Sequence, residues 1–281
     1  MSDKEKEQSE DRLTGAELIH PYDDSRAKSE QVEEMFDSIA PAYDFMNLAM
    51  TFGLHRLWQR HALNVATKQM SAHVGYDILD IATGTGDIAF ELYRRFPRSR
   101  IKGVDLSEGM LRIAEKKLKK LDQNGQKSIT FEQGDSLDLR YDDNSFDLIT
   151  VAYGVRNFEH LSRGLAEMAR VLRPGGKLCI IELSRPRRGL TLWLYQFYTR
   201  CIIPLIGRVV SGDSRAYTYL PESIAAAPQR EAMTAIMSEA GLSDCKWKSL
   251  TFGAVTYYIA GKDSAASSST EGEHKNTTPN E

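Results

Sequence analysis

DILDIATGTGDIAF, residues 77–90, joins an apolar stretch to an amphipathic stretch through a turn that contains Gly84 and Gly86. The apolar residues predict a buried strand, and the spacing after the glycines predicts a helix. Strand, glycine turn and helix in this order are typical of the first βαβ unit of a doubly wound sheet, whose ligands bind at the carboxyl ends of the parallel strands. This stretch therefore predicts an α/β fold with a ligand site at its glycine turn.

Further apolar runs alternate with helical patterns after this unit. We expect parallel strands at residues 76–82, 101–106, 128–134, 146–152 and 177–184. Crossover helices are predicted in DIAFELYRRF, SEGMLRIAEKKLKKL and LSRGLAEMARVLRPGG, the last ended by Pro174 and a glycine pair. Near the end, PQREAMTAIMSEAGL predicts a helix, and CKWKSLTF and AVTYYIAG predict an antiparallel pair. The pattern predicts a Rossmann-like, doubly wound sheet of seven strands with an antiparallel terminal strand.

The composition divides the chain into one domain between two tails. Residues 1–30 are polar, and residues 263–281 hold no apolar residue larger than Ala apart from Pro279, so we expect both tails to be disordered. The domain covers residues 31–262. Within it, we expect residues 31–70 to form a helical lid and residues 185–227 to form an apolar insertion that covers a substrate.

The overall charge and the cysteine and histidine patterns exclude several classes of protein. A formal net charge of -3 gives no basic field for nucleic acid, so we expect no nucleic-acid partner. The start lacks the apolar core of a secretory signal, and no run of about 18 apolar residues suggests a membrane span, which predicts a cytoplasmic protein. The 3 cysteines and 6 histidines form no CxxC or HxxxH pattern, which predicts that the protein holds no metal.

The glycine turn alone fits two cofactors. Gly84, Thr85 and Gly86 begin a match to GxGxxG/A, which binds the pyrophosphate of a dinucleotide, but a similar turn holds S-adenosylmethionine. Asp105 follows Gly86 by 19 residues at the end of the second strand, where its carboxylate can accept hydrogen bonds from two ribose hydroxyls. At this point both cofactors remain open.

Other acidic and apolar residues at the same sheet edge favour S-adenosylmethionine. Asp80 precedes the glycines, where a carboxylate suits a cationic amino-acid group and is poorly placed beside a pyrophosphate. Asp135 and Ser136 follow the third strand and are positioned to bond an adenine amino group, while Leu106 and Met110 pack against the ring. A turn role for Asp135 is the alternative. Together these residues predict that S-adenosylmethionine is the cofactor.

Two longer stretches are similar to the quinone-biosynthesis C-methyltransferases, which methylate demethylmenaquinol or 2-methoxy-6-polyprenyl-1,4-benzoquinol. YDFMNLAMTFGLHRLW begins at Tyr43 and has Thr51 where the family usually has Ser, and RVLRPGGKLCIIELS ends at Ser184 and has Arg173 where Lys is usual. GVRNF and YTYLPESI also resemble the family, and the likeness covers residues 32–262. It implies a class I methyltransferase fold, a polyprenylated quinol substrate, and cofactor contacts from Thr85, Asp105, Asp135 and Ser136.

The chemistry that this resemblance implies needs a group that favours a phenolate. A quinone carbon is electrophilic, so the acceptor must be the reduced quinol, whose ionised oxygen makes the ortho carbon nucleophilic. Arg156 follows the fourth strand and is our candidate to stabilise the phenolate or to hold a water that takes the proton. Asn157 is positioned to orient the same oxygen, and Asp44 is a candidate general base. Pairing of Arg156 with Glu159 at the surface is the alternative.

The substrate is expected to contact the lid and the insertion. Tyr43 belongs to the lid, and Tyr217 and Tyr219 follow the insertion's apolar run and are predicted to reach the quinol ring. The run itself, residues 190–210, is too polar and kinked to span a bilayer. An apolar face of this run suits a prenyl tail or a membrane surface, and it consists of Trp193, Phe197, Ile203 and Ile206. Arg200 and Arg208 are expected to contact lipid phosphate. Ordinary packing of the run in the core is the alternative.

Several readings of the function stay open at this stage. We prefer methylation of demethylmenaquinol to methylation of the ubiquinone precursor, by a protein at the inner face of the membrane. An NAD-dependent oxidoreductase is a different class, but no YxxxK pair follows the fourth strand to relay a proton. A catalytically silent S-adenosylmethionine sensor or membrane adaptor is a third. Oligomerisation is left open.

Overall fold

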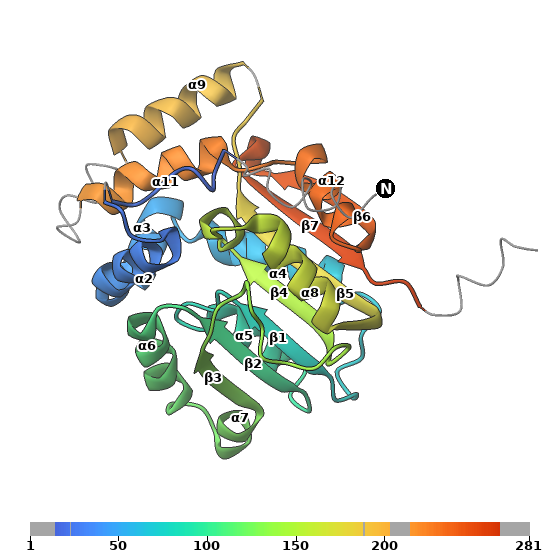
Figure 1. Ribbon diagram of the computed structural model, residues 1–281. Coiled ribbons are helices and arrows are strands. Elements are labelled where there is room, and N and C mark those ends of the chain that lie inside the picture. The colour runs from blue at the N-terminus through green and yellow to red at the C-terminus, as the bar shows by residue number, and fades with distance from the viewer. Residues whose placement is uncertain (1–14, 23, 188, 203–213, 265–281) are drawn as a thin grey trace, which may run out of the picture.

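The computed structural model describes residues 15–22, 24–187, 189–202 and 214–264 (Figure 1). Its elements are, in chain order, α2 (Lys28–Ile39), η1 (Ala40–Ala42), α3 (Tyr43–Thr51), α4 (Leu54–Ala66), β1 (Asp77–Ile81), α5 (Asp87–Arg95), β2 (Arg100–Asp105), α6 (Glu108–Leu118), α7 (Gln123–Ser128), β3 (Ile129–Gln133), β4 (Phe146–Ala152), η2 (Val155–Asn157), α8 (Leu161–Val171), β5 (Leu172–Leu183), α9 (Leu190–Phe197), η3 (Tyr198–Ile202), α11 (Ser214–Ala226), α12 (Glu231–Glu239), β6 (Ser243–Leu250), η4 (Thr251–Gly253) and β7 (Val255–Gly261).

The strands form one seven-stranded sheet in the order β3-β2-β1-β4-β5-β7-β6. The first five strands pair in parallel, whereas β7 pairs antiparallel with both β5 and β6. This confirms the predicted α/β sheet with an antiparallel end. Because the order reverses between β1 and β4, the carboxyl ends of these two strands open onto a crevice where ligands of such sheets bind.

The start of β5 differs from the prediction. We expected the preceding helix to run to Pro174, but α8 ends at Val171 and β5 begins at Leu172, which pairs with Phe146 of β4. Gly175 adopts a φ of 80° and donates its backbone N–H to the carbonyl of Lys262 at 2.8 Å. The segment with the proline and glycines is thus an irregular start of the strand.

Two layers of helices bury the two faces of the sheet. Neighbouring residues of β1 point to opposite faces, as the pleat requires. Leu79 packs in a core with side chains of α8 and α12, and Ile78 packs in a second core with side chains of α4 and α5. This sandwich holds the carboxyl ends of β1, β2 and β4 in fixed positions.

A third cluster caps one edge of the sheet. It joins Met35 and Ile39 of α2, Met46 of α3, Met110 of α6 and Tyr219 of α11. In Figure 1, α2, α3, α9 and α11 gather beyond one end of the sheet. Only the first part of the predicted lid lies in this cap, because α4 belongs to the core against the sheet.

Part of the predicted first tail packs against the domain. Ala16 is buried, Glu17 accepts a hydrogen bond from the backbone N–H of Leu161 at 2.6 Å, and α2 begins at Lys28. The expectation of disorder is therefore wrong for the described part of residues 15–30, because this polar segment packs its few apolar atoms against the domain. Residues 1–14 and 265–281 lie outside the described residues.

The insertion after β5 forms α9, η3 and α11, and residues 203–213 of it lie outside the described residues. No residue of α9 is buried. The hydroxyl of Tyr198 in η3 donates to the carbonyl of Met50 and so ties the insertion to α3. Among the helices that the structure describes, none combines the length and apolarity needed to cross a membrane.

Candidate active site

The two glycines of the turn after β1 serve different purposes. Gly84 has a φ of 56° and lies where an added Cβ would meet nothing within 4 Å. Gly86 has a φ of 85°, and an added Cβ would lie 2.8 Å from the ring of Phe90 and 2.9 Å from the ring of Phe131. Gly86 therefore lets α5 approach the sheet, while Gly84 keeps the backbone open to a ligand.

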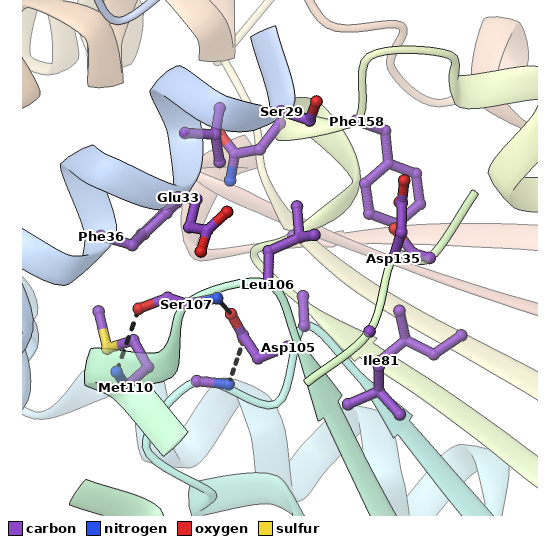
Figure 2. A pocket seen from close by; sticks show the side chains of 18 of the residues that line it. Ser29, Glu33, Phe36, Ile81, Asp105, Leu106, Ser107, Met110, Asp135 and Phe158 are labelled. Carbon is purple, nitrogen blue, oxygen red and sulfur yellow. Dashed lines mark hydrogen bonds between the residues drawn. The ribbon is translucent and has the colours of Figure 1, made fainter. Parts of the chain in front are cut away.

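Asp105 organises this turn from the end of β2. Its carboxylate accepts the backbone N–H of Gly84 at 2.7 Å and that of Ser107 at 2.9 Å (Figure 2). Burial raises the pKa of Asp105 to about 6, although these backbone donors oppose the shift. The carboxylate thus joins the glycine turn to the start of α6.

The cavity beside Asp105, which we name cavity 1, is acidic. It holds about 750 Å³ of empty space, solvent at its mouth included. Asp105, Asp135, Glu33 and Glu159 line it, and no Lys, Arg or His is found among the described residues of its wall. Figure 2 shows Glu33 reaching from α2 into the cavity towards Leu106 and Asp105. Such a wall suits a cationic ligand and opposes a pyrophosphate.

The predicted adenine contacts all line cavity 1. Its wall includes Leu106 and Met110 of the β2–α6 region, and Asp135 and Ser136 after β3. The carboxylate of Asp135 accepts the backbone N–H of Leu137 at 2.9 Å, so the turn role that we weighed for Asp135 is also present. The structure therefore brings the four predicted residues together around one space.

Three other predicted cofactor residues are not found in the described wall of cavity 1. Asp80 is 1% exposed, and its carboxylate accepts the hydroxyls of Thr83 and Thr150, each at 2.6 Å. Burial raises the pKa of Asp80 to about 7. Asp80, Thr85 and Gly86 are not among the described residues that line cavity 1, so their contact with the cofactor stays a prediction.

Asp44 joins the cap to the glycine turn. Its carboxylate accepts the hydroxyl of Thr85 at 2.6 Å and pairs with the ammonium of Lys117 at 2.6 Å. Lys117 also pairs with Asp87 at the start of α5. Asp44 is not among the described residues that line cavity 1, and its role as a base stays a prediction.

A second cavity, cavity 2, lies between the cap and the sheet edge. It holds about 1150 Å³ of empty space and is walled mostly by apolar and aromatic side chains of α2, α3, α4, η3 and α11. Phe36, Tyr43 and Tyr153 line both cavities. A ligand in cavity 1 and a ligand in cavity 2 would therefore meet at these three rings.

Arg156 is a buried cation in the wall of cavity 2. It is 7% exposed and pairs with Glu182 of β5 at 2.8 Å, so the surface pairing with Glu159 is not formed. Its Nη1 also donates to the carbonyl of Tyr153. Among the described residues, the buried Nε of Arg156 and the buried hydroxyl of Tyr153 have no hydrogen-bond partner. Two donors are thus left unsatisfied inside the wall of cavity 2.

Asn157 and Tyr219 come from separate parts of the chain and contact each other. The hydroxyl of Tyr219 donates to Oδ1 of Asn157 at 3.1 Å. Asn157 lines cavity 1, and Tyr219 lines cavity 2. Burial raises the pKa of Tyr219, so its hydroxyl keeps its proton. Tyr217 lies in α11, but its side chain is outside the described part of the structure.

Sequence reasoning missed Glu33, Phe36 and Tyr153. Glu33 and Phe36 lie in a segment that we expected to be a lid but from which we named no cofactor contact. Tyr153 precedes the GVRNF stretch and has a φ of 61°, a strained value for a tyrosine. Its position directly after a predicted strand at the ligand edge is the signal that would have found it.

Lys28 fixes the loop that carries Arg156. Its ammonium is fully buried and lies 2.6 Å from the carbonyl of Ala16 and 3.4 Å from the carbonyls of Arg156 and Phe158. Burial lowers the pKa of Lys28 to about 8. The leading segment of the chain and the loop after β4 are therefore joined through one side chain.

The described residues form no cluster of three His, Cys, Asp or Glu side chains that could hold a metal ion. The three cysteines are free thiols, of which only Cys179 is buried. The wall of each cavity therefore offers hydrogen bonds, charge and apolar surface as its means of binding.

Known proteins of one class resemble this chain. A sequence profile described as the ubiE/COQ5 methyltransferase family matches residues 24–262. A demethylmenaquinone methyltransferase from Bacteroides fragilis is 43% identical over 246 residues, which cover 88% of this chain and 98% of the relative. A ubiquinone/menaquinone biosynthesis C-methyltransferase from Geobacter sulfurreducens is 40% identical over 236 residues, which cover 84% of this chain and 90% of the relative.

The fold also resembles that of solved structures. A SAM-dependent methyltransferase from Thermotoga maritima matches with a TM-score of 0.54 over 82% of this chain and 99% of that chain. The two sequences are 18% identical, so this likeness shows a shared fold and no more.

Proposed function

The chain belongs to the ubiE/COQ5 methyltransferase family, and from that premise we propose that it transfers the methyl group of S-adenosylmethionine to a ring carbon of demethylmenaquinol. One observation carries this proposal. An acidic cavity and a largely apolar cavity adjoin at Phe36, Tyr43 and Tyr153. A cationic methyl donor is favoured by an acidic cavity, whereas an apolar aromatic acceptor is favoured by an apolar cavity. This pair of cavities provides both.

The residues of cavity 1 fit S-adenosylmethionine. When bound, this cofactor supplies a sulfonium whose methyl group an electron-rich carbon can attack. The carboxylate of Asp105 lies at the rim beside Gly84 and is available to the ribose hydroxyls, while Asp135 and Ser136 are available to the adenine edge. The four carboxylates of the wall favour the ligand's positive charge, whereas a dinucleotide would bring a pyrophosphate to a wall whose described residues include no cation.

The residues of cavity 2 fit a quinol. The aromatic wall offers Phe36, Tyr195 and Tyr198 to a ring and its prenyl tail. Arg156 and Tyr153 both line this space, and each holds an unpartnered donor buried in its wall. The fixed charge of Arg156 favours an ionised quinol oxygen, which raises the electron density of the neighbouring ring carbon.

We prefer the menaquinone precursor to the ubiquinone precursor as the substrate. The relative from Bacteroides fragilis is named a demethylmenaquinone methyltransferase, whereas the more distant relative from Geobacter sulfurreducens carries a name that covers both branches. A naphthalene ring is also broader and more apolar than a methoxylated benzene ring, in keeping with the aromatic wall of cavity 2.

We further propose that the protein rests on a membrane surface while it acts. Leu190, Trp193, Leu194 and Phe197 of α9 are 71%, 60%, 50% and 52% exposed. The rings of Trp193 and Phe197 stack with centroids 6.1 Å apart. An exposed apolar helix beside the substrate cavity gives a prenyl tail a path from a bilayer. The side chain of Arg200 and residues Ile203, Ile206 and Arg208 lie outside the described part.

The function is tested with methyl-labelled S-adenosylmethionine and chemically reduced demethylmenaquinone under anaerobic conditions. We expect labelled menaquinol, and a slower reaction with the reduced methoxy polyprenyl benzoquinone. Binding of S-adenosylmethionine without a labelled lipid from either acceptor would favour the sensor or adaptor. Tight binding of NAD and none of S-adenosylmethionine in calorimetry would overturn the cofactor assignment.

A further inference from the structure

A row of polar side chains crosses the wall of cavity 2. Tyr43, Asn47, Thr51 and His55 follow one another at intervals of four residues, and all four line this cavity. This spacing places the first three on one side of α3, and a contact between Thr51 and His55 continues the row into α4 across the turn at Phe52 and Gly53. Because Tyr43 also lines cavity 1, the row leads from the junction of the cavities into cavity 2.

Hydrogen bonds along the row fix the tautomer of His55. The hydroxyl of Thr51 donates its single hydrogen to the carbonyl of Asn47 at 2.6 Å. The same oxygen lies 2.6 Å from Nδ1 of His55, so in this contact the ring nitrogen must be the donor. In a neutral imidazole with its proton on Nδ1, the other nitrogen, Nε2, carries a free lone pair. No described residue hydrogen-bonds that atom.

His55 is also the one group in the described wall of cavity 2 that suits a base. No Asp or Glu is found among those wall residues. The tyrosines keep their protons, since burial raises the pKa of Tyr195 to about 12 and also raises that of Tyr198. Arg156 is a cation that favours a phenolate but does not take its proton.

The surroundings of His55 keep its ring neutral. Its ring is buried with the residue 4% exposed, and burial lowers its pKa below the usual value. Among the neighbouring charges, Arg56 on α4 lowers the pKa further, while Asp87 on α5 and Asp44 on α3 oppose the shift. At neutral pH the imidazole is therefore ready to accept a proton.

Resting on the proposed function, we propose that His55 is the general base of the methyl transfer. Nε2 takes the proton of the quinol hydroxyl next to the accepting carbon, and the electron pair stays on oxygen. The ring carbon then bonds to the methyl group, and the electron pair of the S–C bond passes to sulfur. The carbon loses its own proton to water, the oxygen regains one from the imidazolium, and the aromatic quinol and neutral His55 are restored.

The test compares His55→Gln, Thr51→Val and Thr51→Ser with the wild type at saturating S-adenosylmethionine. We expect His55→Gln to lower kcat for reduced demethylmenaquinone by about 100- to 10,000-fold with cofactor affinity unchanged. Thr51→Val should give a smaller loss, because it frees the ring to hold its proton on Nε2, and Thr51→Ser should stay near the wild type. Thermal unfolding of each variant identifies any that fail to fold.

A pH profile separates a base from a packing residue. In the wild type, kcat/KM for the quinol should fall as pH drops through the pKa of His55, and in His55→Gln this acid limb should disappear. A folded His55→Gln enzyme with turnover within about threefold of the wild type, or with the same acid limb, overturns the proposal. If the wild type itself transfers no label, the proposed function fails instead.

Discussion

The two cavities adjoin but come from different parts of the chain. The wall of cavity 1 is built largely from the turns that follow β1, β2, β3 and β4. Cavity 2 is walled mainly by helices added to the sheet, namely α2, α3, α4, η3 and α11. In a doubly wound sheet, the turns at the carboxyl edge are set by the strands themselves. The shared fold therefore accounts for the cofactor half, and the added helices account for the choice of acceptor.

The two cavities also differ in the charges of their walls. Cavity 1 has four carboxylates and, in its described wall, no cation. Among the described residues of its wall, cavity 2 has one buried cation, Arg156, whose charge is balanced by Glu182. Changes in one half should thus affect mainly one measurable quantity, cofactor affinity or turnover.

The largest effect is expected from Arg156→Ala. Turnover should fall by about 100- to 10,000-fold with cofactor affinity within about twofold, because the fixed charge that favours the phenolate is lost. Labelled methyl transfer and calorimetry measure the two quantities. Since this change leaves Glu182 buried without its partner, the double variant Arg156→Met, Glu182→Gln is measured alongside. Unchanged turnover in either folded variant would remove Arg156 from the mechanism.

Asp105→Asn should act on cavity 1 and therefore on cofactor affinity. We expect cofactor affinity to fall by about 10- to 100-fold, the usual worth of a charged hydrogen bond, while quinol binding stays within about twofold. Calorimetry measures both. Asp244→Asn, at a carboxylate that is 74% exposed on β6, is the matched control. Equal loss of quinol binding would show that the two cavities do not act separately.

Acid should weaken cofactor binding through Asp105. Its pKa is raised to about 6, so the ionised form that favours a cationic ligand is present above this pH and is lost as the pH falls through it. We expect affinity to fall about tenfold between pH 7 and pH 5, measured by calorimetry. Asp105→Asn should lack this dependence, and an identical pH response in that variant would assign it to another group.

A smaller effect is expected at the exposed face of α9. Replacing Trp193 and Phe197 by Ser should lower affinity for lipid vesicles about fivefold, because each ring loses apolar contact with the bilayer. Vesicle sedimentation measures this, and Val74→Ser, at a residue that is 46% exposed before β1, is the control. Vesicle affinity that does not change would count against the membrane contact, while turnover on a short-tailed quinol should stay the same.

The smallest effect is expected from Asp80→Asn. The raised pKa of Asp80 means that its contribution to stability is greatest in acid and is lost as the pH rises through about 7. The variant should therefore melt about 3 °C higher than the wild type at pH 8 and show little difference at pH 5. Cofactor affinity should fall less than in Asp105→Asn. A loss of cofactor affinity as large as that of Asp105→Asn would indicate that Asp80 contacts the cofactor.

The sequence allowed the strands, the glycine turn and the wall residues Asp105, Asp135 and Ser136 to be predicted. These features are local, because each residue directly follows a strand whose apolar run is visible. Glu33 and His55 needed the structure. Their roles depend on how α2, α3 and α4 pack over the sheet edge, and an amphipathic pattern shows which face of a helix is buried but not what it is buried against.

The hidden ammonium of Lys28 has a consequence for the chain's leading segment. Its charge holds the carbonyls of Ala16 and Arg156 together, so loss of that charge would loosen the leading segment and the loop of Arg156 at the same time. Turnover would then fall in a protein whose sheet and helices remain folded.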